Sequence, residues 1–474
     1  MRSLVSSDLT TPSALHGAHI LGALIISLAT LLAVVLRLPF GLPVLIFGAG
    51  AFTLAALRVD TSLYAAVFFL PIPLRLPEEF PVHDVTVLVR VMMFLGIFVR
   101  LLLEGRSLRS WLLGTRLSQL TVGYGFISLL SALLFNQRSA LGMAAPIWLL
   151  SYICFYFTIT GWVRTERQMR TIIGLLLLST VIVALFGLYQ AAIGDYGDLY
   201  DRLYPNRSIS VVFWTGRITS FLNYCTCLAG YLNLALPFAL ACTVMHLSKN
   251  LRLLGISCLI PATIALVLTQ TRGGVFAFAG TLLLGLFLLA RDVKIRKVVA
   301  VIVLVTVLVS LPLLAQPSSR YSTILDDSAV GRFVFWDAAW GMFLSSPLIG
   351  VGYGNFGGLF ELPGEDIRRD VHNIYLQSLA ETGVMGFAIF FLLVAVALRT
   401  AWRQFHRPRH LTDRVLGFAA LGAILSVLTH GLVEYLFNAS PQFGTLFWML
   451  LALLSASAGL QAGERPGGVR VVAT

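Results

Sequence analysis

Long apolar runs separated by short polar loops form the hydropathy pattern of this chain. A helix needs about 20 consecutive apolar residues to cross a lipid bilayer. Runs near this length predict about 12 to 14 transmembrane helices. The fourteen candidate spans are residues 18–36, 40–57, 61–74, 82–103, 117–135, 140–162, 169–193, 219–247, 251–270, 273–290, 298–314, 375–398, 415–433 and 442–462. The third run is short and ends in Pro71 and Pro73, which is typical of a re-entrant segment.

The composition excludes a series of soluble domains. A chain of 474 residues has room for about three of them, but 58% of its residues are hydrophobic and only 12% are charged. Soluble domains are about 45–50% apolar and about 25% charged. Disorder, collagen and coiled coil are excluded for the same reason. We therefore predict an all-α polytopic membrane protein, with residues 1–474 forming a single membrane domain surrounded by lipids.

The basic residues predict how the chain is oriented. Cytoplasmic loops carry an excess of Lys and Arg. If the N-terminus lies inside, most of the 34 Lys and Arg residues fall in inner loops, and this bias holds at every alternation between inner and outer loops. Both termini are then cytoplasmic, and the first apolar run stays as a helix because no cleavable signal pattern precedes it. This rule also accounts for the net charge of +12, so nucleic acid is not an expected partner.

Only two outer segments have room for chemistry, a large one at residues 315–374 and a smaller one at 194–218. The large segment contains the run Asp326-Asp327-Ser328, which is typical of a helix start. Aromatic residues then recur every three or four positions, which predicts an amphipathic helix lying on or near the membrane. These residues are Phe333, Trp336, Trp340 and Phe343.

Two further segments have glycines at the predicted outer side. Residues 350–358 follow no predicted strand and lack the Lys-Ser/Thr of a nucleotide-binding loop. We interpret them as a flexible turn whose N–H groups can meet an anion, and we expect no nucleotide. Residues 259–290 are too long for one span and break at a polar hexapeptide. We expect two spans there, joined by a tight outer turn that Gly273 and Gly274 supply.

Four ionisable residues lie at the predicted outer boundary, namely Arg217, Arg272, Arg332 and His372. Each alone fits a headgroup anchor or a cap. Together, guanidinium forks suited to phosphate oxygens and a histidine able to deprotonate a hydroxyl indicate a lipid-linked phosphate or diphosphate substrate. The outer loops contain no metal-binding motif, so we expect neither a metal nor another cofactor. We interpret Cys225 and Cys227, a CxC pair within an apolar run, as buried thiols.

The sequence from Arg332 to Gly386 resembles the O-antigen ligase family, which includes O-antigen and exopolysaccharide polymerases. The ligase pattern is His, then Asn, Ser or Gln, nine residues, Gly, two residues, and Gly, Thr or Tyr. His372, Asn373, Gly383 and Gly386 match it completely.

Two arginines extend the resemblance, which covers roughly residues 210–450. Arg272 matches the family's arginine in a turn reading S/T-R-G. Arg332 best matches a second arginine in an Arg-x-x-x-Leu pattern, although here the fourth residue on is Trp336 rather than Leu.

The resemblance implies glycan transfer at the periplasmic face of the bacterial inner (plasma) membrane. The donor is expected to be a glycan linked to polyprenyl (undecaprenyl) diphosphate. Arg272 and Arg332, helped by Arg217, are expected to hold the diphosphate, and His372 to be the general base in a metal-independent, inverting displacement. Further contacts to diphosphate or glycan are expected from Asn373, Trp336 and Tyr375.

Several alternatives stay open. A ligase delivers the glycan to lipid A–core, whereas a polymerase delivers it to another lipid-linked glycan, and the His-Asn pattern favours the ligase. A transporter or flippase keeps charges near the bilayer midplane, where only Arg90 is expected. A peptidoglycan-type polymerase of the rod-shape and division class would use a catalytic aspartate, for which Asp370 is placed.

Overall fold

The protein is an all-α membrane protein, as predicted. The computed structural model describes residues 50, 53, 60–72, 85–135, 140–194, 216–222, 224–245, 247–289, 293–314, 327–360, 370–437 and 440–462. These residues form helices and no strand. The helices are α3 (Asp60–Phe68), α4 (Val85–Leu103), α5 (Leu108–Leu113), α6 (Arg116–Leu134), α7 (Ala140–Trp162), α8 (Glu166–Ile193), α10 (Cys225–Met245), α11 (Lys249–Leu268), α12 (Arg272–Leu289), α13 (Val293–Leu314), α14 (Asp327–Ser345), α15 (Phe356–Leu359), α16 (Ile374–His406), α17 (Leu411–His430) and α18 (Pro441–Ala462).

Ten of the helices described are long and apolar enough to cross a membrane, and each occupies one of the predicted spans. They are α4, α6, α7, α8, α10, α11, α12, α16, α17 and α18. The helix α13 forms where the eleventh run predicts it but is not among the ten. The third run forms α3, which has nine residues and is too short to cross. The first two runs lie almost wholly outside the described residues.

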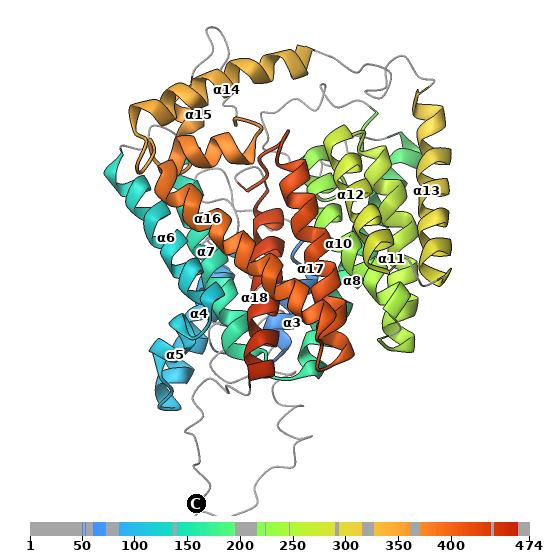
Figure 1. Cartoon of the computed structure of the whole chain (residues 1–474), viewed down its shortest axis with the longest axis horizontal. Coiled ribbons are helices and arrows are strands. Elements are labelled where there is room, and N and C mark those ends of the chain that lie inside the picture. The colour runs from blue at the N-terminus through green and yellow to red at the C-terminus, as the bar shows by residue number, and fades with distance from the viewer. Residues whose placement is uncertain are drawn as a thin grey trace, which may run out of the picture.

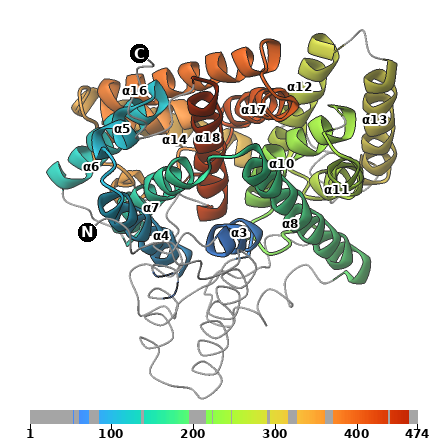
Figure 2. The same ribbon diagram turned by 90° about the horizontal axis from the view of Figure 1, so that it is seen from below.

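The helix α10 is the centre of the bundle. All of its residues from Leu228 to Val244 are buried, which is expected of a helix that is apolar on every side. It packs against α11 and α17, while α13 lies at the edge of the molecule beside α11 and α12 (Figures 1 and 2). The helix α14 lies across one end of the bundle, at the top of Figure 1. We refer to this end as the α14 end.

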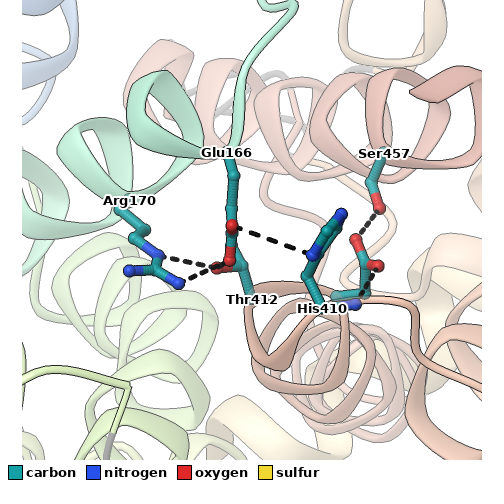
Figure 3. A network of polar contacts seen from close by, with 6 residues as sticks. Glu166, Arg170, His410, Thr412 and Ser457 are labelled. Atoms are coloured by element: carbon teal, nitrogen blue, oxygen red, sulfur yellow. Dashed lines mark hydrogen bonds and ion pairs between the residues drawn. The ribbon is translucent and has the colours of Figure 1, made fainter. Parts of the chain in front are cut away.

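A polar network joins three helices at the opposite end (Figure 3). Glu166, in the first turn of α8, accepts hydrogen bonds from Arg170 and from Thr412 of α17. Asp413 accepts from the backbone N–H of His410 at 3.1 Å and from Ser457 of α18 at 2.7 Å. The starts of α8 and α17 are therefore tied to the end of α18.

The helix α16 is broken at Gly383, where φ is 61° and ψ is −168°. The loop that follows α14 fills this break. Val384 donates its backbone N–H to Pro347 at 2.8 Å, and Met385 donates to Leu348 at 3.1 Å. Since intrahelical acceptors are missing at the break, the loop supplies them. The loop after α14 is thus hydrogen-bonded to α16, the helix that begins just after His372.

The glycine-rich loop is packed inside the protein, so the prediction of a flexible turn is wrong. Residues 350–357 are all buried. A Cβ on Gly350 would lie 2.3 Å from the carbonyl carbon of Glu381, so only glycine fits this approach. The N–H of Phe356 donates to Oε1 of Glu381 at 3.3 Å. This N–H therefore meets a carboxyl group of the protein itself.

The predicted tight turn between α11 and α12 exists, but the glycine pair does not make it. The chain turns at Thr269–Thr271, where Gln270 has a φ of +49°. Gly273 and Gly274 lie within the first turn of α12. A Cβ on Gly274 would lie 2.9 Å from the Cβ of Ala229 in α10. This glycine therefore serves close packing of helices rather than the turn.

Candidate active site

A histidine–carboxylate pair lies at the α14 end of the bundle. His372 immediately precedes the start of α16, and its Nδ1 is 2.6 Å from Oε1 of Glu434. Glu434 is buried just beyond the end of α17. The histidine side chain stays 31% exposed, so its ring is accessible to a reacting group while Glu434 is held inside.

The charges around this pair decide which ring nitrogen is basic. Burial raises the pKa of Glu434, but His372, His430 and Arg332 outweigh it and hold that pKa at about 2. Glu434 is therefore a carboxylate near neutral pH and can only accept a hydrogen bond. Nδ1 of His372 must carry the proton, which leaves the lone pair on Nε2. Burial lowers the pKa of His372, but Glu434 and then Asp370 raise it above its ordinary value.

Three residues predicted to contact substrate make hydrogen bonds to backbone groups around His372. Asn373 caps α16 by accepting from the backbone N–H groups of the next turn, and its Nδ2 donates to the carbonyl of Leu432 at 3.0 Å. The hydroxyl of Tyr375 donates to the carbonyl of Leu428 at 3.0 Å. Nε1 of Trp336 donates to the carbonyl of Val371 at 3.1 Å. These bonds fit positioning roles, and substrate contact by the three residues stays a prediction.

The structure brings Arg332 to the histidine. It lies in α14, the predicted amphipathic helix, which leaves Phe333 and Trp340 exposed and packs Phe335 inward. The rings of Phe335 and His372 are 6.0 Å apart. Arg332 is also one of the charges that lower the pKa values of His372 and Glu434. Its guanidinium group therefore acts on the same site.

Arg272 and Arg217 lie at the start of α12 and beside the turn that precedes it. Arg272 is the first residue of α12. The next residue, Gly273, packs so closely on Val433 that a Cβ would lie 2.6 Å from Cγ2 of that valine. Arg217 is buried, and it donates from Nε to the carbonyl of Thr269 at 2.8 Å and from Nη2 to Oγ1 of Thr271 at 3.2 Å. Arg217 thus supports the turn that presents Arg272.

Strained backbone conformations occur at or near the predicted site residues. In the described part of the chain, three residues other than glycine have a positive φ, and they are Ser220, Gln270 and His372. Each lies at, or within three residues of, a site residue expected from the sequence. Strained conformations of this kind persist where surrounding structure enforces them, and they cluster at functional sites.

Glu434 is not among the residues predicted from the sequence, although one signal for it is present. It is an acid at the outer end of a span, four residues after His430, at the same predicted boundary as His372. Asp370 also lies near the pair, because His372 and Glu434 both shift its pKa, and burial raises that pKa to about 6. Within the described residues, no three His, Cys, Asp or Glu side chains group as ligands for a metal ion.

The remaining candidate, Arg90, is not part of this site. It is buried in α4, where it donates to Thr445 of α18 and lies over the ring of Tyr152 in α7 at 5.4 Å. These contacts join α4, α7 and α18. This arrangement explains an intramembrane arginine by packing, without the transport path that a flippase needs.

Part of the chain matches a known protein family. No curated protein matches the chain. Residues 257–391 match the family described as O-Antigen ligase. The matched segment contains Arg272, Arg332 and His372, while Arg217 and Glu434 lie outside it. The resemblance seen in the sequence is confirmed over this segment, which matches the O-antigen ligase family.

Proposed function

We propose that the protein transfers a glycan from undecaprenyl diphosphate to an acceptor hydroxyl at the α14 end of the bundle, with lipid A–core as the acceptor. The observation that carries this proposal is the pairing of His372 with Glu434, beside Arg332 and the start of α12. It combines a base with cationic groups at the boundary of a membrane-spanning bundle. The family match supports glycan transfer by a membrane enzyme of this type.

The proposed reaction is one displacement. Nε2 of His372 takes the proton of the acceptor hydroxyl as its oxygen forms a bond to the anomeric carbon. The bond from that carbon to the diphosphate oxygen breaks, and undecaprenyl diphosphate leaves with the electron pair. Attack opposite the leaving group inverts the anomeric centre. Glu434 stabilises the imidazolium that forms, because a carboxylate 2.6 Å from Nδ1 favours the charged ring.

The arginines act on the leaving group. A diphosphate already departs readily, so the enzyme must orient it and stabilise the charge that it gains. Arg272 and Arg332 suit this role because guanidinium groups bind phosphate oxygens in a fork. We assign Arg217 an indirect part, since its hydrogen bonds hold Thr269 and Thr271 next to Arg272.

Reconstitution tests the function. The full-length protein is placed in liposomes with an undecaprenyl diphosphate-linked glycan, with and without lipid A–core, and products are followed by gel mobility and mass. Glycan attached to lipid A–core is the expected result. A ladder of longer lipid-linked chains made from the donor alone would show a polymerase that uses the same donor. No product with either acceptor would contradict glycan transfer.

Arginine substitutions test the charge stabilisation. We expect Arg272→Ala and Arg332→Ala each to lower kcat/KM by about 10²–10³-fold, as removal of one group that stabilises developing charge typically does. Lysine at either position should restore activity only in part, because its ammonium group keeps the charge but lacks the planar fork. Arg252→Lys, on an exposed residue of α11, is the control. Full activity in both lysine variants would show that the fork is not used.

A further inference from the structure

A second histidine lies beside the proposed site and has no role in the mechanism above. His430 is in the last turn of α17 and is 3% exposed. Within the part of the chain that the structure describes, neither of its ring nitrogens has a hydrogen-bond partner. A buried polar group without a partner destabilises the folded protein. Such a group is therefore expected to find its partner in a ligand.

The ring of His430 faces the N-terminal turn of α12. A Cβ on Gly273 would lie 3.2 Å from its Cδ2 and 3.6 Å from its Nε2. The missing side chain of Gly273 thus allows the imidazole to lie against the start of the helix. The first N–H groups of an α-helix have no acceptors within the helix, and this end carries partial positive charge. The imidazole and the helix terminus therefore present donors to the same place.

The charges around His430 favour an anion there. Arg272 begins α12 next to Gly273, and Arg332 is close enough to act electrostatically on His430. Glu434 is the acid that acts on this histidine, but its Oε1 is already paired with His372. Helix N-termini flanked by guanidinium groups bind phosphate oxygens.

Packing alone does not account for a histidine at this position. Ser426 lies one turn earlier on α17 and faces the same helix. Its Oγ hydrogen-bonds Oγ1 of Thr281 at 2.8 Å and the carbonyl of Ala277 at 3.3 Å, so these bonds already join α17 to α12. His430 makes no such bond to a described residue of α12.

We infer that His430 is a binding residue for the diphosphate of the lipid-linked donor and donates a ring N–H to a phosphate oxygen at the start of α12. This inference rests on the proposed function. As the bond from the anomeric carbon to the diphosphate breaks, negative charge grows on the leaving oxygens, and the hydrogen bond from His430 becomes stronger. His430 and Arg272 then hold the diphosphate while His372 acts on the acceptor.

The test measures binding of undecaprenyl diphosphate to the full-length protein in nanodiscs. His430→Leu removes both ring nitrogens, and His430→Gln keeps an N–H donor. We expect His430→Leu to weaken binding by about tenfold, as the loss of a hydrogen bond to a charged group does. His430→Gln should recover most of the affinity. Ser426→Ala, on the same helix face, should bind like the wild type. His430→Met is a second variant without a donor, should the leucine variant not fold.

The outcomes distinguish a failure of this inference from a failure of the proposed function. Folded His430→Leu or His430→Met protein that binds undecaprenyl diphosphate as tightly as the wild type overturns the inference and leaves the proposed function in place. An equal loss of affinity in His430→Gln and His430→Leu also overturns it, because the donor would then not matter. A wild-type protein that binds no undecaprenyl diphosphate overturns both.

Discussion

Replacement of His372 by alanine is expected to lower kcat for glycan transfer by about 10²–10⁴-fold, the range that a general base typically contributes. The folded state should persist, because the helix cap is made by Asn373 and the adjacent backbone is held by Trp336. The measurement is the initial rate in liposomes at saturating donor and acceptor. Binding of undecaprenyl diphosphate should change little, since His372 acts on the acceptor.

The pH dependence of the same rate tests the pairing with Glu434. A general base works only in its unprotonated form, so the rate falls as the pH drops below the pKa of His372. Glu434 raises that pKa. Glu434→Gln removes this influence, so the pKa of His372 falls and the acidic limb of the profile moves to lower pH. The plateau rate should also fall, because the imidazolium is then less stabilised.

Asp370 supplies the control for this assignment. If the aspartate were the catalytic group, as in the peptidoglycan-type alternative, Asp370→Asn would abolish transfer and His372→Ala would leave much of it. Our mechanism requires the reverse order. Near-normal activity in His372→Ala protein would show that the base lies elsewhere.

The spans could be predicted because each depends on a continuous stretch of sequence. A run of about 20 apolar residues between charged loops has few other stable arrangements. Ten predicted spans are accordingly found as helices. The helix α14 could also be predicted, because its aromatic pattern repeats within one segment.

The site could be predicted only where a local pattern marks it. His372 and Arg272 lie in short motifs that can be read directly. Glu434 lies 62 residues beyond His372 and meets it only because α16 and α17 pack together. No spacing rule within one chain predicts such a pair. His430 could not be predicted for the same reason, because its proximity to Gly273 depends on the packing of α17 against α12.

The role of a glycine is a second feature that could not be predicted from the sequence. Gly273 and Gly350 read as turn residues, yet both allow close approach to another segment. A glycine that gives a turn and one that makes room for a neighbour look identical in a sequence. Only the packed structure separates the two uses, and Gly350 and Gly383 show both at once, because each has a positive φ and a close neighbour.

Gly383→Ala is expected to destabilise the protein by more than about 4 kcal/mol, the range of changes that break a special backbone conformation or a packed core. At a φ of 61° and a ψ of −168°, the backbone is in a region that is accessible essentially to glycine alone. A Cβ would also lie 2.4 Å from the carbonyl carbon and oxygen of Leu348 and 2.5 Å from the nitrogen of Ile349. Backbone atoms cannot rotate away as a flexible side chain does.

Thermal unfolding of the purified variant at a fixed scan rate measures this effect. The matched control is Gly341→Ala in α14, where an added Cβ would meet nothing within 4 Å. That change should be neutral or stabilising by about 0.5–1 kcal/mol, because alanine favours a helix. An unfolding midpoint for Gly383→Ala within a few degrees of the wild type would show that the break in α16 closes without loss. The loop after α14 would then not need the break, and the position of Arg332 beside His372 would need another support.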